Sequence, residues 1–197
     1  SPASSMRYAG ISPEIGLSET QQTLVRNGLR GKVRLQTDGQ MKTGHDIVSM
    51  ALLGAEEFGF GTTVLIVLGC VMMRKCHSNT CPMGVATQNP ELRAHFRGHT
   101  DHVVNYFRFL AEEVREYLAE MGFRKFNDII GRTDLIEIDK AVSQKSELLD
   151  FSRLLHKESG DASIRHTEAQ MHDIDSVLDR TIITASYPAI SNGKEVS

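Results

Sequence analysis

The sequence predicts an α/β fold, because strand patterns and helix patterns alternate between residues 33 and 72. KVRLQTDG alternates apolar and polar residues with the period of a strand and ends in an Asp-Gly turn. HDIVSMALLG follows as a helix, with Asp46 in its first turn and Gly54 at its end. EEFGFG then predicts a second short strand that ends in a Gly-Phe-Gly turn.

The next run, TTVLIVLGC, fits either a strand or a helix. Its β-branched residues favour a strand. Its position after a strand and a glycine turn, with Thr62 or Thr63 as N-cap, favours a helix. The alternation of strands and helices decides for the helix. Nearer the N-terminus, TQQTLVRNGL predicts a short helix capped by Thr20, after a loop over residues 1–20.

The clearest helix is DHVVNYFRFLAEEVREYLAEMG, which ends at Gly122. Its apolar residues recur at three- and four-residue steps and predict a core-facing side, whereas we expect its charged side, including Glu112 and Glu113, to be solvated. Before this helix, Asn89-Pro90-Glu91 is typical of a helix start. After it, FNDIIGRTDLIEI predicts a shorter helix and a turn.

The chain divides into three predicted segments. Residues 1–140 form the main unit, residues 141–175 are polar and weakly periodic and predict a linker, and residues 176–197 begin a new unit. The chain starts without methionine and ends at GKEVS, so we expect an excerpt from a longer protein.

Composition excludes several classes of protein. The chain of 197 residues is 40% hydrophobic and carries a net charge of −3, so no basic face for nucleic acid is expected. The longest apolar run, Val64–Met73, is too short to span a bilayer, and the N-terminus has no signal core. Three clustered thiols indicate a reducing compartment, and an odd count cannot close into disulfides without one left over.

All three cysteines lie in CVMMRKCHSNTCPMG, as Cys70, Cys76 and Cys81. Three interpretations compete for the spacing C-x5-C-x4-C. Unligated thiols can pack as small hydrophobes, but this segment is a polar loop. A zinc site would use His77 as fourth ligand, although His77 adjoins Cys76 and paired CxxC knuckles are absent.

The third interpretation is an iron–sulfur cluster. Four-iron clusters normally take four cysteines, so three cysteines match a cluster of three irons and four sulfides. Arg74 and Lys75 place positive charge beside an anionic cluster, and loop N–H groups can donate to its sulfides.

Two glycine turns, TDGQMKTG and GFGTT, each follow a predicted strand and lead into a helix. Glycine lets backbone N–H groups approach an anion, and a helix N-terminus adds positive charge. In (β/α)8 barrels the loops after strands 7 and 8 are the usual phosphate site. The turns therefore suggest those two strands and a phosphorylated cofactor such as FMN. Lys42 would either neutralise the phosphate or be a solvated loop lysine. Glycine turns without a ligand are equally common.

Taken as a series, three motifs resemble the synthase region of glutamate synthase large subunits. They are DGQ-x-KTG, LLGAEEFGFGT and GC-x-MMR-x-CH-x-NTCP-x-GVATQ-x-PELR. The resemblance continues through HVVNYFRFLAEEVREYLAEMGFR and IIGRTDL, and fades over residues 141–175.

The resemblance implies the C-terminal part of a (β/α)8 barrel with strands 7 and 8, a 3Fe-4S loop at residues 70–81, and at residues 176–197 the start of a β-helix domain. It implies Cys70, Cys76 and Cys81 as the cluster ligands. It implies an FMN-binding segment from about Leu17 to Gly69. The implied FMN contacts are Asp38, Gly39, Gln40, Lys42, Thr43, Gly44, Gly59, Phe60, Gly61 and Thr62.

In that family, ammonia from glutamine reaches 2-oxoglutarate, and the resulting imine is reduced by FMN to glutamate. Electrons pass through the 3Fe-4S cluster and come from an NAD(P)H-oxidising subunit or domain, or from ferredoxin. We expect the cytoplasm, with the plastid stroma as the alternative, because both fit the resemblance. Charge and hydropathy predict neither nucleic acid nor membrane as partner. The catalytic residues are not identified, and we expect this chain alone to be inactive.

Two positions depart from the family pattern, because Gln21 and His45 stand where a histidine and an arginine are expected. Both lie in the implied flavin region, so flavin contacts there are in doubt. The alternative function is a non-catalytic metal or electron-transfer module that keeps only the thiol loop.

Overall fold

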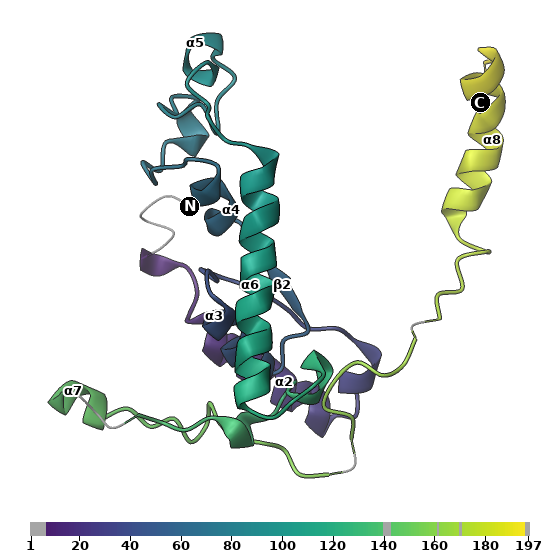
Figure 1. The fold of residues 1–197 in the computed structure, drawn as a ribbon. Helices are drawn as coiled ribbons and strands as arrows, with labels where there is room; N and C mark the ends of the chain where they lie inside the picture. The colour runs from purple at the N-terminus through teal and green to yellow at the C-terminus, as the bar shows by residue number, and fades with distance from the viewer. Residues whose placement is uncertain (1–6, 140–142, 161, 170, 196–197) are drawn as a thin grey trace.

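Two short parallel strands and the helices around them form the centre of the computed structural model (Figure 1). The structure describes residues 7–139, 143–160, 162–169 and 171–195. Its helices and strands are α2 (Pro13–Arg26), β1 (Gln36–Asp38), α3 (Gly44–Leu52), β2 (Glu57–Gly59), α4 (Thr62–Val67), α5 (Pro90–Arg93), α6 (Thr100–Glu120), α7 (Gln144–Glu147) and α8 (Leu178–Asn192). Short 3-10 turns cover Arg30–Lys32, Cys76–Ser78, Phe126–Asp128 and Thr133–Leu135.

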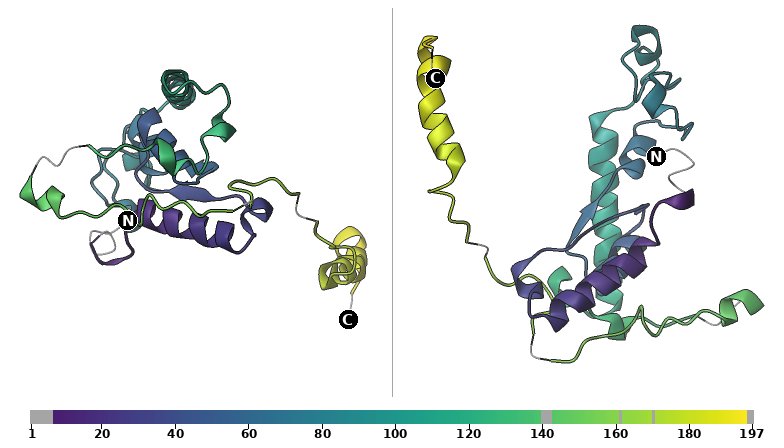
Figure 2. Two further views of the ribbon diagram at one scale, coloured as in Figure 1. Left: turned by 90° about the horizontal axis from the view of Figure 1, so that it is seen from below. Right: turned by 180° about the vertical axis from the view of Figure 1, so that it is seen from behind.

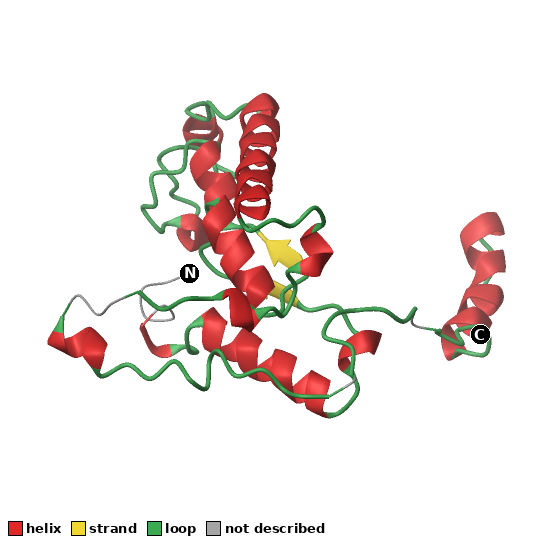
Figure 3. Ribbon diagram, turned by 60° about the horizontal axis from the view of Figure 1, so that its bottom comes forward, coloured by secondary structure: helices red, strands yellow, loops and turns green. Residues whose placement is uncertain are grey.

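The predicted alternation of strands and helices is confirmed. Strands β1 and β2 pair in parallel, with Thr37 opposite Phe58 and Asp38 opposite Gly59 (Figure 3). The helix prediction for TTVLIVLGC is also confirmed by α4, although the cap was placed wrongly. Gly61 is the N-cap of α4, and no side chain caps this helix.

The N-terminal helix starts earlier than predicted, because α2 begins at Pro13 and not at Thr20. Pro13 fits the first helical position, where a missing N–H costs nothing, and Glu14 supplies an acid in the first turn. Thr20 lies inside the helix, where its hydroxyl donates to the carbonyl of Gly16 at 2.7 Å. The part of the loop prediction that covers residues 13–20 is therefore wrong, and residues 1–6 lie outside the described part of the chain.

The segment FNDIIGRTDLIEI forms two 3-10 turns and not the predicted helix. Gly131 separates the turns with a φ of +71°, a left-handed conformation that a continuing helix does not contain. Ile129 and Ile130 are nonetheless almost fully buried, so their side chains fill part of the hydrophobic core.

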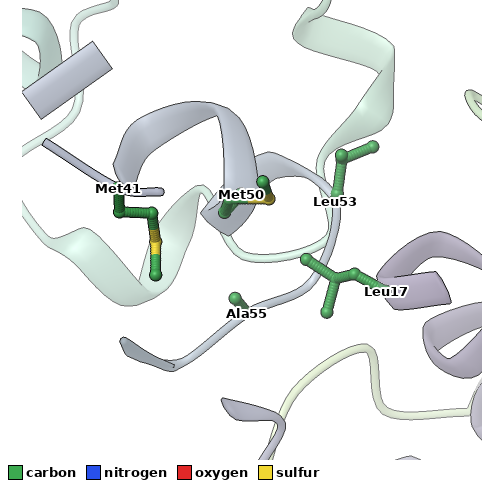
Figure 4. Close-up of a cluster of buried hydrophobic side chains, with 5 residues drawn as sticks. All are labelled: Leu17, Met41, Met50, Leu53 and Ala55. Carbon is green, nitrogen blue, oxygen red and sulfur yellow. The ribbon is translucent and has the colours of Figure 1, made fainter. Parts of the chain in front are cut away.

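Helix α3 is buried on two sides and organises the core. One side joins a cluster of Leu17, Met41, Met50, Leu53 and Ala55 (Figure 4). The other side packs against the C-terminal half of α6 in a second cluster of Val48, Ala51, Leu52, Leu118 and Ile129. The predicted apolar side of α6 is therefore confirmed as a packing surface.

The side chain of Arg30 is completely buried near the residues that precede the two strands. Its guanidinium donates to Gln21 Oε1 (2.5 Å), Val33 O (2.7 Å), Gly54 O (3.0 Å) and Glu56 Oε2 (2.7 Å). A buried arginine of this kind is stable only when its donors meet acceptors and its charge meets an opposite charge. Because Val33 precedes β1 while Gly54 and Glu56 precede β2, one side chain joins the starts of both strands.

Residues 150–160 and 162–168, here called the return segment, run beside α2 without a helix or strand of their own (Figure 2). Its hydrogen bonds to the body include Ser18 Oγ to Leu154 O (2.5 Å), Gln21 Nε2 to Ile164 O (2.8 Å), Glu158 N to Gln22 Oε1 (2.7 Å), His166 N to Glu56 Oε1 (2.9 Å), and Thr167 N and Glu168 N to Gly31 O (both 2.9 Å). Ion pairs of Glu158 with Arg26 and of Lys157 with Asp134 add to them. The return segment therefore shares Gln21 and Glu56 with Arg30.

Helix α8 stands apart from the body (Figures 1 and 2). Residues 178–192 are helical, while the predicted boundaries at residues 140 and 175 and the predicted β-helix domain stay predictions. Within the described residues, none of the helices combines the length and the apolar character needed to cross a bilayer.

Replacement of Arg30 by methionine should lower the free energy of unfolding by about 3–5 kcal/mol, since Glu56 would keep a buried charge without its partner. The matched control is Arg34→Met, which removes an exposed ion pair with Glu57 and should cost less than about 1 kcal/mol. Urea denaturation measures both, and equal losses would contradict the special role of Arg30.

Candidate functional site

Each glycine turn follows a strand, as predicted, and the two turns lie at one edge of the strand pair. Asp38 and Gly59, the last residues of β1 and β2, are opposite each other in the ladder. They are also in close contact, because a Cβ on Gly59 would lie 3.0 Å from Asp38 Cγ. The carboxyl edge of a parallel sheet is the usual ligand-binding edge of an α/β protein.

The first turn directs its backbone N–H groups toward the protein's own carboxylates. Lys42 N and Thr43 N donate to Asp46 Oδ2 at 2.8 and 3.0 Å, and Gly44 N donates to Glu113 Oε2 at 2.7 Å. Thr43 Oγ1 accepts from Asp46 N at 3.2 Å and completes a capping box. The N-terminus of α3 therefore already has two anionic partners.

The ionisation of Asp46 reflects these contacts. Burial acts to raise the pKa of this carboxyl group, but the N–H donors of Lys42 and Thr43, the Thr43 hydroxyl and His45 together hold the pKa below its usual value. Asp46 is consequently an anion at neutral pH and stabilises the start of α3. Tyr106 of α6 closes the same turn, because its hydroxyl donates to Lys42 O at 2.5 Å.

Glu113 is the residue of this turn that sequence reasoning missed. The prediction that its side chain is solvated is wrong, since Glu113 is half-buried and accepts a hydrogen bond from Gly44 N. The close approach of α6 needs a glycine there, because a Cβ on Gly44 would lie 2.8 Å from Glu113 Cγ and 3.0 Å from Val114 N. A charge on a helix surface gives no signal for a partner 69 residues away.

The second turn, Gly59–Thr62, is the more open of the two. Gly61 is exposed, and a Cβ on it would meet nothing within 4 Å. Thr63 ties this turn to the first, because its hydroxyl donates to Met41 O at 2.7 Å. Phe60 is held edge-on against Phe107 of α6, with ring centroids 5.1 Å apart. An anion could therefore reach the backbone at Gly61 through open space. At the first turn, by contrast, it would have to displace a carboxylate of the protein itself.

The thiol loop brings two of the three cysteines to one cavity. This cavity of about 170 Å³ is lined by Thr62, Leu65, Cys70, Met72, Arg74, Cys76 and His77. Cys81 is buried and does not line it. Across the part of the chain that the structure describes, no three cysteine, histidine or acidic side chains are gathered closely enough to hold a metal.

Backbone N–H groups nevertheless surround the sulfur atoms. Met72 N donates to Cys70 Sγ at 3.4 Å. The N–H of Ala86 is the largest of several causes that lower the pKa of the Cys81 thiol, followed by burial, which opposes it, and by the N–H groups of residues 83–85. Cys81 is thus surrounded by donors that favour its thiolate form, the form that binds metals.

The loop also has an unusual backbone. Met72, Arg74 and Asn79 adopt left-handed conformations with φ between +55° and +59°. Arg74 is followed by Lys75 at φ −99° and ψ 15°, and such a change of hand points successive N–H groups into one concavity. Nests of this kind are found at phosphate and iron–sulfur sites. The donor set therefore fits a cluster, although the position of Cys81 does not complete the ligand set.

Gln21 and His45, the two departures from the family pattern, both contact other parts of the protein. Gln21 is almost fully buried and joins Arg30 to the return segment. His45 packs edge-on against Tyr117, with ring centroids 5.9 Å apart. Both residues therefore contribute to packing around the strand pair.

The fold and the site define an α/β segment. The carboxyl edge of its parallel strand pair, where α/β proteins usually bind ligands, is followed along the chain by a thiol-bearing loop. Residues 1–124 match the family model described as the conserved region in glutamate synthase, and the chain belongs to this family.

Individual relatives agree with the family match. The chain is 52% identical to the glutamate synthase [NADPH] large chain of Bacillus subtilis (strain 168) over 99% of its length. It is 47% identical to the glutamate synthase [NADH] of Schizosaccharomyces pombe over 95% of its length, and 46% identical to the chloroplastic ferredoxin-dependent glutamate synthase of Oryza sativa subsp. japonica over all of it. The chain spans 13%, 9% and 12% of these relatives, respectively.

Replacement of Asp46 by asparagine should cost about 1 kcal/mol of stability at neutral pH, because two N–H groups lose a charged acceptor. The lowered pKa makes this contribution complete above the ordinary value of 3.8 and lost as pH falls through the folded-state pKa. The difference between Asp46→Asn and the unmodified protein should therefore shrink below about pH 4.

The control for this prediction is Asp101→Asn, since Asp101 also lies in the first turn of a helix, α6. It should cost only a few tenths of a kcal/mol. Thermal unfolding between pH 3 and pH 7 measures both variants, and a difference that grows in acid would refute the assignment.

Proposed function

We propose that this chain is the flavin- and iron–sulfur-binding end of a glutamate synthase. In this proposal β1 and β2 are strands 7 and 8 of a (β/α)8 barrel, and residues 70–81 hold a 3Fe-4S cluster. The whole enzyme would transfer ammonia from glutamine to 2-oxoglutarate and reduce the product to glutamate. The observation that carries the proposal is the parallel strand pair whose two glycine turns share one edge and lead through α4 into the thiol loop.

The thiol loop has few buried residues of its own, which supports a bound cluster as the source of its stability. Between residues 70 and 99 only Cys81 and Gly84 are buried, and neither hydrophobic cluster includes a residue from this stretch. Units this small rarely fold through apolar burial alone and usually rely on metal ligation or disulfides. Thiolate ligation by Cys70, Cys76 and Cys81 would supply this stabilisation.

The flavin edge would use the second turn for the phosphate. Gly61 offers an open backbone at the start of α4, whereas the first turn is closed by Asp46 and Glu113. Asp38, Gly39 and the rest of the first turn would then form a rigid wall of the site. When bound, FMN supplies hydride transfer and the cluster supplies single-electron transfer, while the chain orients both groups.

Partners and location follow from the same proposal. The electron donor would be an NAD(P)H-oxidising subunit or domain, or ferredoxin. The names of the three relatives support this, because they contain NADPH, NADH and ferredoxin, respectively. Substrates would be glutamine and 2-oxoglutarate, bound by parts of the enzyme outside these residues. We assign the protein to the cytoplasm, with the plastid stroma as the alternative.

The full-length protein that carries this sequence, purified without oxygen, should contain iron and acid-labile sulfide in the ratio of a 3Fe-4S cluster. Cys76→Ser should lose both, because a thiolate ligand is removed. Ser78→Ala is the control in the same loop, since it removes a hydroxyl that bonds to Lys75 O and Thr80 Oγ1 but no thiol. If the protein instead contained one zinc ion and no sulfide, the cluster assignment would be wrong. The site would then be a zinc site that includes His77, which lines the cavity of Cys70 and Cys76.

Gly61→Ala should weaken FMN binding about tenfold, the loss expected when one or two charge-assisted hydrogen bonds to a phosphate are broken. The added methyl group meets no protein atom, so thermal stability should not fall. Gly16→Ala, which also meets nothing within 4 Å, is the control. Fluorescence titration of the flavin-free protein with FMN measures the effect, and unchanged affinity in Gly61→Ala would remove the phosphate from this turn.

A further inference from the structure

Two of the three cysteines face the same small space. Cys70 and Cys76 line one cavity of about 170 Å³, the volume of about six water molecules at about 30 Å³ each. Cys81 is buried and does not line this cavity. Its sulfur accepts from the N–H groups of residues 83–86 instead. The thiols therefore divide into a pair and a separate third group.

The backbone between the paired cysteines changes direction twice. Met72 and Arg74 have φ values of +58° and +55°, in the left-handed region that residues other than glycine seldom adopt. Both cysteines consequently reach the same cavity although five residues separate them. A connection of this length lets two backbones approach to the separation that a disulfide needs, about 4–7 Å between Cα atoms.

The segment that carries the pair can adjust without disturbing the core. Residues 70–80 are exposed or half-buried, and neither hydrophobic cluster includes any of them. Segments with few buried contacts rearrange at low cost in free energy. A movement that brings the sulfur atoms of Cys70 and Cys76 to bonding distance would therefore leave the helices and strands in place.

Both thiols of the pair are open to a small oxidant. Cys76 is exposed, and Cys70 is half-buried. Arg74 lines their cavity, and the exposed Lys75 precedes Cys76 in the chain. Reactive cysteines are typically partly exposed and close to basic side chains, and they often have a second cysteine nearby that completes a disulfide. Cys76 fits the first role and Cys70 the second.

We propose that Cys70 and Cys76 form a reversible disulfide when no metal group occupies the loop, and that Cys81 stays a free thiol. A peroxide would oxidise the Cys76 thiol to a sulfenic acid and release one water. The Cys70 sulfur would then attack the Cys76 sulfur, form the S–S bond and release a second water. The two thiols together lose two hydrogens, and the peroxide is reduced to two waters. A dithiol reverses the change by thiol–disulfide exchange.

The disulfide and the proposed cluster exclude each other. In the proposed function Cys70 and Cys76 are two of three cluster ligands, and a disulfide leaves neither as the thiolate that binds iron. The pair is inferred from the loop alone, and only this exclusion rests on the proposed function. Because a disulfide is reducible whereas sulfinic and sulfonic acids are not readily reversed, the pair would preserve both ligands through oxidation.

The test uses the full-length protein, freed of metal by chelation, reduced with dithiothreitol and then treated with about two equivalents of hydrogen peroxide. The remaining thiols are alkylated, and tryptic peptides are analysed by mass spectrometry. Trypsin cleaves after Arg74 and Lys75, so Cys70 lies in one peptide while Cys76 and Cys81 share another. A bond from Cys70 thus joins two peptides, a bond between Cys76 and Cys81 stays within one, and fragmentation of the joined peptides identifies the partner of Cys70.

We expect the Cys70–Cys76 bond in most chains, at least about tenfold less of either bond to Cys81, and loss of the bond in dithiothreitol. Cys81→Ser should keep the bond, and Cys76→Ser should leave Cys70 unlinked. A Cys76–Cys81 bond, similar amounts of all three pairs, bonds between chains, or sulfinic acids without any bond would each overturn the inference. Fragmentation assigns the bond in the unmodified protein, so this result does not depend on the folding of a variant.

Iron and sulfide analysis of the protein as isolated separates this inference from the proposed function. The fraction of chains with the disulfide and the fraction with a cluster should together not exceed the whole. Chains that carry both groups would overturn the cluster ligands of the proposed function, while the disulfide stands. A protein that holds the cluster, but forms no disulfide under peroxide once it is free of metal, would overturn the pair alone.

Discussion

The buried guanidinium of Arg30 is the interaction on which the rest of the structure depends. It holds the carbonyls of Val33 and Gly54 and the carboxylate of Glu56, so the starts of β1 and β2 are fixed to the same side chain. Strands this short have few ladder hydrogen bonds of their own, and their register must be fixed from outside. The same network reaches the return segment through Gln21 and Glu56, which closes this end of the strand pair.

The opposite end of the strand pair has a different role. Register at the start of the strands determines that Asp38 and Gly59 end side by side, and therefore that both glycine turns emerge at one edge. Helix α6 then distinguishes the turns. It supplies Glu113 to the first turn, which becomes rigid and anionic, and only a ring contact to the second, which keeps an open backbone. The Arg30 network thus lies at one end of the strand pair and the candidate binding edge at the other, a division that (β/α)8 barrels also show.

Local sequence signals predicted the strand–helix alternation, the helix at residues 62–67, the cap at Asn89 and the apolar side of α6 correctly, because each depends on neighbouring residues. They failed where the deciding contact is distant. Glu113 looks like any solvated acid until α6 meets Gly44. The polar residues 150–160 and 162–168 give no local signal of the hydrogen bonds that their backbone makes with Gln21, Gly31 and Glu56. For the candidate site, the sequence predicted that each glycine turn follows a strand and leads into a helix, while the FMN and cluster ligands stay predictions.

Residues 70–99, a lobe that carries all three cysteines, show why the sequence and the fold alone do not bring the three thiols together. Its hydrogen bonds are local, such as those that Asn79 accepts from Thr87 and Gln88, and its single buried sulfur lies apart from the cavity of the other two. A lobe without a core is stabilised mainly by whatever binds its folded form, by an amount that grows with ligand concentration over the dissociation constant. Ligand binding and ordering of Cys70, Cys76 and Cys81 would therefore be a single equilibrium. The backbone nest at Arg74 and Lys75 and the donors around Cys81 would lower the cost of reaching the bound arrangement. The nest already points its N–H groups into one concavity, and the N–H groups around Cys81 already point at its sulfur.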